Sequence, residues 1–221
     1  MILPLPQLSR RYLIIDIDTH RDLLLAGNDS CVRTQRKLLA HIRRLMAWAR
    51  HTNIPIISTV EVHSDKRWPT IGHCIDGSER QTKIAYTLRN NRISIPADGM
   101  NFLPAGLLQA HKQVILHKRC IDPFDEPRLD RLLSEVQADE FILIGASTEG
   151  AVKATALGLL QRGKNVQVVA DAIGSHNKRE AELALHKMQV KGVRLIATKN
   201  LVGVSHLRKV DGCFRRRQPI A

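Results

Sequence analysis

The chain has 221 residues, of which 43% are hydrophobic and 25% charged, a composition typical of one folded domain and unlike that of a disordered chain. Lys and Arg number 34 against 21 Asp and Glu, so the formal net charge is +13. No apolar run approaches the roughly 18 residues of a membrane span, and the first twelve residues lack the apolar core of a secretory signal.

Four scattered cysteines, Cys31, Cys74, Cys120 and Cys213, form no CxxC pair. This spacing argues against a disulfide framework and against a four-cysteine zinc site. Reduced thiols are the usual state in the cytoplasm, where we therefore expect the protein to be located, without a membrane partner.

Short β-rich runs alternate with helical patterns along the chain. The runs predict strands at 12–16, 54–60, 113–117, 141–145, 166–170 and 193–196. Apolar residues at three- and four-residue spacing predict helices at 34–49, 127–136, 148–161 and 176–189. Such alternation indicates a single-domain, three-layer α/β/α fold with a six-stranded parallel sheet. We expect the domain to occupy residues 1–210, followed by a basic C-terminal tail at 211–221.

One stretch, 61–110, is rich in Pro and Gly and has little periodicity. A loop of this length inside a compact domain usually has a function, so we expect it to form a lid over the site. A short helix is predicted within it near 81–88.

Polar side chains follow the ends of several predicted strands. In chain order they are Asp16, Glu61, His63, Lys118 and the turn 145–151. Because ligands of an open parallel sheet bind beyond the carboxyl ends of its strands, these groups predict a site at one edge. N–H groups at the start of the helix after 145–151 suit a developing negative charge. Asp18 and His20, which follow Asp16, are interpreted as loop residues.

Four segments in order resemble the isochorismatase-like hydrolase superfamily, which includes nicotinamidases, N-carbamoyl amidohydrolases and isochorismatases. They are Leu13–Asp16 (LIID), Lys118–Phe124 (KRCIDPF), Ile144–Leu157 (IGASTEGAVKATAL) and Val168–Ala172 (VVADA). The resemblance covers nearly the whole chain and implies that Asp16 and Lys118 are catalytic. It implies that the turn residues Ser147, Thr148 and Gly150 bind a small-molecule substrate, and that the protein is a homo-oligomer.

Ala151 occupies the position at which the amidase-type members carry their nucleophilic cysteine. A methyl group cannot attack a carbonyl, so covalent thiol catalysis is absent there. Three interpretations stay open: a hydrolase without a nucleophile, a catalytically silent pseudoenzyme, and a nicotinamidase-like cysteine amidohydrolase whose cysteine was replaced. We expect the first, in which Asp16 acts as the acid and Lys118 holds the charge of a small anionic substrate.

A metal site is a further implication of the resemblance. Nicotinamidase-like members bind a divalent metal through an acid-x-His pair and a later histidine, to which Glu61, His63 and His73 correspond. A carboxylate with two imidazoles suits zinc, manganese or iron. The alternative is a surface glutamate beside ordinary loop histidines.

Basic residues gather at 33–50, which contains no acid, and near the C-terminus. Such patches suit nucleic-acid phosphates. However, only 4% of the residues are aromatic, so platforms for stacked bases are scarce. We interpret these residues as a solvated face and a loose tail and expect no nucleic-acid partner.

Overall fold

The structure, a computed structural model, describes residues 11–25, 32, 35–63 and 74–203. One sheet of seven parallel strands lies at its centre, in the order β3-β4-β2-β1-β5-β6-β7. The strands are β1 (Tyr12–Ile17), β2 (Ile56–Glu61), β3 (Arg92–Ile95), β4 (Gln113–Lys118), β5 (Glu140–Ala146), β6 (Val166–Gly174) and β7 (Arg194–Ile196). The three-layer α/β fold is confirmed, but the expected number of six strands is wrong because β3 lies inside the predicted loop.

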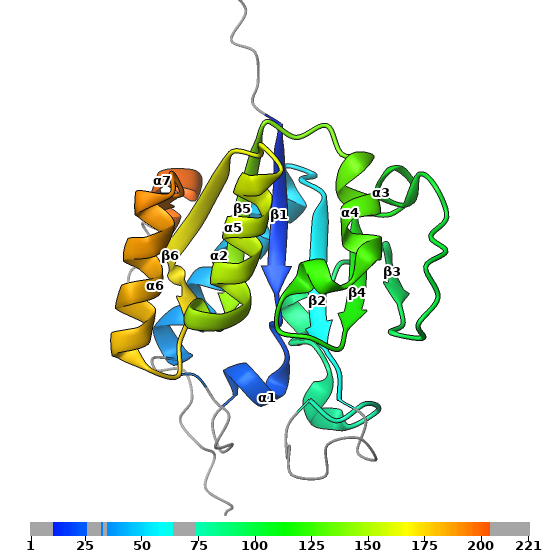
Figure 1. Cartoon of the computed structure of the whole chain (residues 1–221), viewed down its shortest axis with the longest axis horizontal. Coiled ribbons are helices and arrows are strands. Elements are labelled where there is room, and N and C mark those ends of the chain that lie inside the picture. The colour runs from blue at the N-terminus through cyan, green and yellow to red at the C-terminus, as the bar shows by residue number, and fades with distance from the viewer. Residues whose placement is uncertain (1–10, 26–31, 33–34, 64–73, 204–221) are drawn as a thin grey trace, which may run out of the picture.

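Helices cover both faces of the sheet (Figure 1). The longer helices are α2 (Gln35–His51), α4 (Pro127–Ser134), α5 (Lys153–Gln161) and α6 (Lys178–Val190), with short helices α1 (Arg21–Leu24), α3 (Leu107–Ala110) and α7 (Thr198–Val202). The helix predicted at 81–88 is replaced by two 3-10 turns, η1 (Glu79–Gln81) and η2 (Ala85–Thr87). A third 3-10 turn is η3 (Pro123–Asp125). No helix of the described residues has the length and apolarity needed to cross a membrane.

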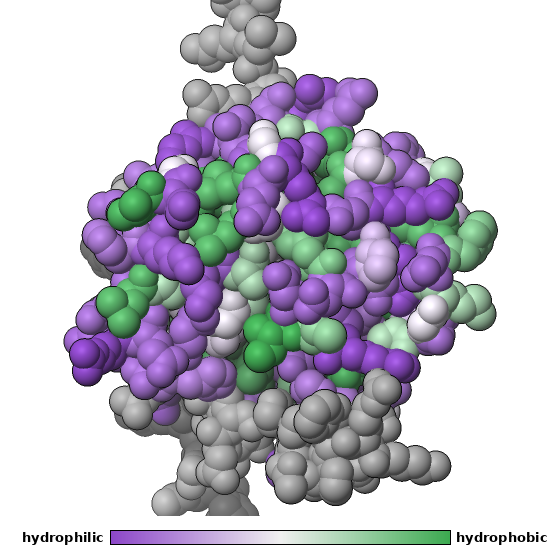
Figure 2. Space-filling view, viewed as in Figure 1, coloured by the Kyte–Doolittle hydropathy of each residue, from purple (hydrophilic) through white to green (hydrophobic). Residues whose placement is uncertain are grey.

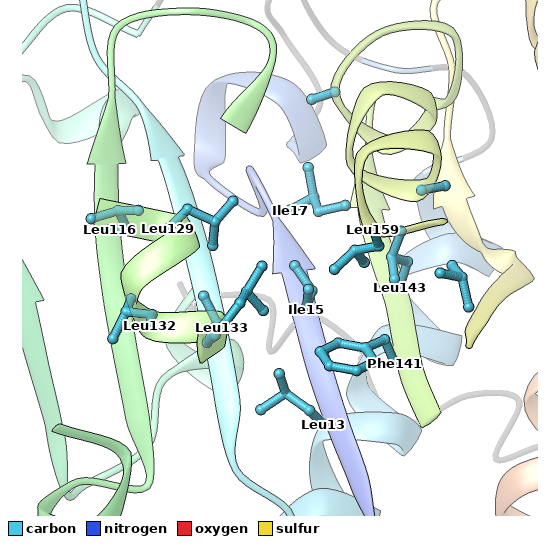
Figure 3. Close-up of a cluster of buried hydrophobic side chains, with 14 of the residues drawn as sticks. Leu13, Ile15, Ile17, Leu116, Leu129, Leu132, Leu133, Phe141, Leu143 and Leu159 are labelled. Carbon is cyan, nitrogen blue, oxygen red and sulfur yellow. The ribbon is translucent and has the colours of Figure 1, made fainter. Parts of the chain in front are cut away.

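The central strand β1 divides the core into two layers. Its side chains alternate between the faces of the sheet, as the pleat requires. Leu13, Ile15 and Ile17 pack on the side of α4, α5 and α6 (Figure 3), whereas Ile14 packs on the side of α2 and α7. Asp16 shares the face of Ile14, which decides what its carboxylate contacts.

Parallel pairing brings the carboxyl ends of the central strands to one edge. Asp16 lies beside Ser58 in the register, Glu61 beside Lys118, and Ile17 beside Gly145. The close approach of β1 to β5 requires glycine at Gly145: its φ is 120°, and a Cβ there would lie 1.9 Å from the carbonyl oxygen of Ile17. The expected site thus has a defined edge of the sheet on which to form.

Candidate active site

Lys118, at the end of β4, lies between two carboxylates. Its Nζ is 2.8 Å from Oδ2 of Asp18 and 3.5 Å from Oε2 of Glu61, and it donates a hydrogen bond to the carbonyl of Cys120. The Lys118 and Asp18 side chains are each 1% exposed. Burial alone lowers the pKa of Lys118, but the charges of Asp18 and Glu61 outweigh it and raise this pKa above its ordinary value. Lys118 is therefore a fixed cation rather than a proton acceptor.

Asp18 is held from its other side by a hydroxyl group. Thr59 Oγ1 donates to Oδ1 of Asp18 at 2.8 Å and accepts the Asp18 backbone N–H at 3.2 Å. Asp18 itself directly follows β1 and has a φ of 49°. This backbone conformation is uncommon for a residue with a side chain, although Asp tolerates it better than most. The turn and the hydroxyl together aim the carboxylate at Lys118.

Asp16, the acid expected to be catalytic, belongs to a separate cluster. Its carboxylate is 2.8 Å from Nζ of Lys83 and accepts hydrogen bonds from Ser58 at 2.8 Å and Thr19 at 2.7 Å. All of these side chains are buried. We expected Asp16 and Lys118 to lie together in one site, and this placement is corrected: the described partners of Lys118 are Asp18 and Glu61.

The alternation of strand side chains explains this correction. Lys118 shares its face with Leu116, which packs on the α4, α5 and α6 side, and Asp16 shares its face with Ile14 on the α2 side. Acids and amines thus form two pairs on opposite faces of one sheet edge. Asp18 reaches the face of Lys118 because it lies past the end of the strand.

The turn after β5 contains Ala151, which the resemblance placed at the position of a nucleophilic cysteine. A π-helical turn, η4 (Thr148–Val152), leads into α5, and the N–H groups of Gly150 and Val152 donate to the carbonyl of Ser147. Ala151 is 3% exposed. A Cβ at Gly150 would lie 2.7 Å from Ser147 Oγ, so only glycine fits there without a shift. The turn is therefore compact, and it presents the methyl group of Ala151.

A pocket of about 190 Å³ joins these groups. It is lined by Asp18, Leu23, Glu61, Ile121, Ser147, Gly150, Ala151 and His176. Of the three turn residues predicted to bind substrate, Ser147 and Gly150 line it. The third, Thr148, is 2% exposed and its hydroxyl donates to the carbonyl of Gly174, which keeps it in the wall behind the pocket.

Two titratable residues of the pocket, Asp18 and His176, were not predicted from the sequence as site residues. His176 follows β6, and its backbone N–H donates to Oε1 of Glu149 at 2.8 Å, which ties the loop before α6 to the η4 turn. The signal for both residues is their position just beyond a strand end, which marks ligand-binding positions in open parallel sheets.

A buried imidazole and a buried thiol lie close to the same charges. Nε2 of His20 is 3.5 Å from Sγ of Cys74, and both residues are fully buried. Burial lowers the pKa of His20 to about 4 and, with the charges of Glu61 and Asp18, raises that of Cys74. His20 is therefore neutral at pH 7, and the Cys74 thiol is protonated. Neither group lines the pocket.

The proposed metal ligands are described only in part. Oε1 of Glu61 and Nε2 of His63 lie 2.8 Å apart, so two donors of the expected kinds are together beside the pocket. His73 lies outside the described residues. Within the described part of the chain no three His, Cys, Asp or Glu side chains form a metal-binding group. The fit to a metal is thus incomplete.

Comparison with known proteins supports the fold. The isochorismatase domain profile matches residues 12–200. Isochorismatase domain-containing protein 2B of Mus musculus is 36% identical over 77 residues, and the match spans only 34% of this chain and 37% of the mouse protein.

Two solved structures are similar over most of their length. An isochorismatase family protein of Desulfovibrio vulgaris has a TM-score of 0.70 at 21% identity, covering 87% of this chain and 97% of that one. A pyrazinamidase of Pyrococcus horikoshii, solved in complex with zinc, has a TM-score of 0.67 at 19% identity, covering 85% and 99%. At this level of identity the likeness concerns the fold alone.

Proposed function

The chain belongs to the isochorismatase domain family, and from this premise we propose that it hydrolyses a small molecule by acid–base catalysis without a covalent intermediate. The observation that carries the proposal is the ion pair between Asp18 and Lys118 at a pocket whose nucleophile position is Ala151. In this proposal the catalytic carboxylate is Asp18, in place of Asp16, which we expected to act as the acid.

Asp18 has the properties of a general base. A carboxylate paired with an ammonium group is favoured in its charged form, and Lys118 stays protonated because its pKa is raised. In the proposed reaction Asp18 accepts a proton from a water molecule, whose oxygen bonds to the electrophilic carbon of the substrate. As the bond to the leaving group breaks, Asp18 returns the proton to that group. Ala151, smaller than cysteine, leaves room for the water.

In the absence of a bound metal ion, the charges around the pocket argue for a neutral or cationic substrate. Asp18 and Glu61 contribute two negative charges and Lys118 one positive charge, so the described cluster carries a formal −1 with neutral histidines. An anionic substrate, which we expected from the sequence, would be repelled by it. The pocket volume of about 190 Å³ is below the roughly 300 Å³ at which drug-sized ligand sites begin, which supports a small substrate.

A divalent cation is a separate part of the proposal. Glu61, His63 and His73 would hold zinc, manganese or iron, and the metal would orient the substrate as a Lewis acid. No step assigned above to Asp18 depends on it. Metal analysis of the purified protein tests it: we expect about one equivalent, reduced at least tenfold in His63→Ala, while unchanged metal content in that variant would contradict it.

We also propose a homo-oligomer in the cytoplasm. The resemblance to the family supports the first point, and the free thiols of Cys74 and Cys120 support the second. Light scattering on the full chain tests the oligomer, and a monomer at micromolar concentration would contradict it.

The experiment for the catalytic proposal follows hydrolysis of nicotinamide, pyrazinamide, an N-carbamoyl amine and a vinyl ether. Intact-mass spectrometry of the protein is recorded during turnover, for wild type and Ala151→Cys. We expect wild-type turnover of at least one compound with an unmodified protein mass, and an acyl adduct on Ala151→Cys with an amide substrate. An adduct on the wild-type protein would overturn the non-covalent mechanism. No turnover in either protein would favour a silent binding member of the fold.

A further inference from the structure

We propose that the exposed face of α2 binds the phosphate backbone of double-stranded nucleic acid, without reading its sequence. This interaction is independent of the pocket and reverses our interpretation of the basic segment from the sequence. Our interpretation changes because the structure places these charges on one exposed side of α2, where they have no ion-pair partners among the described residues.

The basic residues of α2 form two columns on one side of the helix. Arg36, Arg43 and Arg50 are seven residues apart, and Lys37 and Arg44 repeat the same interval one residue further on. Seven residues are nearly two helical turns, so each column repeats about every 10.5 Å along a helix of roughly 25 Å. The exposed small side chains of Ala40 and Ala47 lie between the charged residues along the chain. The opposite side of α2 is buried in the core and consists of Leu38, Ile42, Leu45, Met46 and Ala49.

These cations are not neutralised within the described part of the chain. None of the five α2 cations has an ion-pair partner there, whereas some exposed basic residues elsewhere do, as in the pairs Arg11–Asp139 and Lys178–Glu182. Arg44 and Arg50 donate instead to the carbonyls of Gly203 and Tyr86, which orients the guanidinium groups but leaves their charge. The acid paired with α2 is Asp171, which contacts His41 at 3.4 Å.

Positive charge also extends beyond the helix. Arg89 lies near Arg50, and burial together with the charge of Arg50 lowers the pKa of Arg89. Lys199 is exposed on α7, which packs beside α2. Like charges gathered in this way are stabilised by a polyanion.

The chemistry of the face favours a nucleic-acid duplex over other polyanions. Single strands bind on aromatic platforms, but the aromatic residue of α2, Trp48, is half-buried and lies against Tyr12, with ring centroids 5.8 Å apart. A helix on a membrane surface inserts apolar side chains, and the apolar side of α2 is already in the core. A duplex offers closely spaced phosphates that need only cations for binding.

The test uses fluorescence anisotropy of labelled 20-base-pair DNA and RNA duplexes with the full chain, from 50 to 200 mM NaCl. The test variant is Arg36→Gln with Lys37→Gln and Arg43→Gln. The matched control removes the same charge from exposed positions of α6 and its C-cap, as Arg179→Gln with Lys187→Gln and Lys191→Gln. Thermal melting shows that each variant is folded.

We expect the α2 variant to lose at least about tenfold in affinity at 100 mM salt, and the α6 control about twofold or less. The slope of log K against log salt concentration should fall in magnitude by about 3 in the α2 variant, because each lost phosphate contact removes roughly 0.9. Preference for DNA or for RNA would identify the source of the phosphates. The proposal is overturned by absence of binding at 50 mM salt, by equal losses in both variants, by tighter binding of a single strand, or by binding to phosphatidylserine vesicles alone.

Discussion

Asp18 has little freedom to turn away from Lys118, because three interactions with two neighbours hold it. Lys118 attracts one carboxylate oxygen, Thr59 donates to the other, and the same Thr59 hydroxyl accepts the backbone N–H. A group held in this way is ready for proton transfer without reorganisation, which is a large part of what an enzyme site provides.

Thr59 is accordingly expected to be a positioning residue. Thr59→Val keeps the shape of the side chain but removes both hydrogen bonds to Asp18, and we expect kcat to fall by about tenfold with little change in KM. Thr59→Ser restores the hydroxyl and should recover most of the lost rate. Steady-state kinetics on the compound that wild type hydrolyses fastest measures both variants. Equal rates for Val and Ser at this position would show that the hydroxyl does not act through Asp18.

The sequence alone does not determine whether Asp16 or Asp18 pairs with Lys118. The strand run and the acids after it were evident from residue types, and so was Lys118 at the end of another strand. Continuous apolar strands such as β1 and β4 do not reveal which of their two faces is which, because both are buried. The distinction depends on the pleat of the folded sheet and on the turn at Asp18.

At the scale of elements, the site depends on how closely β1 and β5 approach. Gly145 ends the regular part of β5, where a register shift against β6 begins. Its φ of 120° and the carbonyl of Ile17 leave no room for a side chain. The η4 turn starts three residues later, so a shift here would move Ala151 relative to Asp18.

Gly145→Ala is therefore expected to reduce the free energy of unfolding by at least about 3 kcal/mol, because the strands must separate. Gly77→Ala is a matched control: Gly77 also has a positive φ, of 76°, but a Cβ there meets nothing within 4 Å. We expect Gly77→Ala to lose only about 1 kcal/mol of the free energy of unfolding, which is the cost of a positive φ at a residue with a side chain. Urea denaturation of both variants measures the difference, and a Gly145→Ala protein as stable as the control would contradict the packing described for β1 and β5.

Helices and strands with a clear pattern of apolar residues were predicted more accurately than those without one. The predicted helix at 34–49 ends two residues before the C-terminal end of α2. The apolar side of the helix that was predicted from the sequence is the side that is buried in the core. Strand β3 was missed because Arg92 and Ser94 give it no apolar run; it is an edge strand that pairs only with β4. The turns η1 and η2 have three residues each, too few to produce a helical period.

At the scale of the whole molecule, the buried charges couple folding to pH. His20 has a pKa of about 4 in the folded state, where burial opposes its charge, against an ordinary value of 6.5. Between these values the unfolded chain binds a proton that the native state does not, so this group makes stability rise with pH. The full effect of a shift from 6.5 to about 4 is on the order of 3 kcal/mol.

We therefore expect the melting temperature to fall as the pH is lowered from 6.5 to 4, and part of that fall to disappear in His20→Gln. Calorimetry at intervals of half a pH unit measures it, with His51→Gln, an exposed site on α2, as the control. If His20→Gln and His51→Gln have the same pH profile as wild type, His20 is not the group that couples acid to unfolding.

The two acids at the end of β1 offer the most direct measurement. Asp18→Asn and Asp16→Asn are compared for kcat/KM and for melting temperature. We predict that Asp18→Asn lowers kcat/KM at least about a hundredfold, because the proton acceptor is lost. This variant stays folded because Glu61 remains as an anion beside buried Lys118. Asp16→Asn leaves buried Lys83 without its anion and should cost about 3–5 kcal/mol of stability, with much of the activity of each folded molecule kept. Wild-type kcat/KM in Asp18→Asn would contradict the assignment of the reaction to this carboxylate.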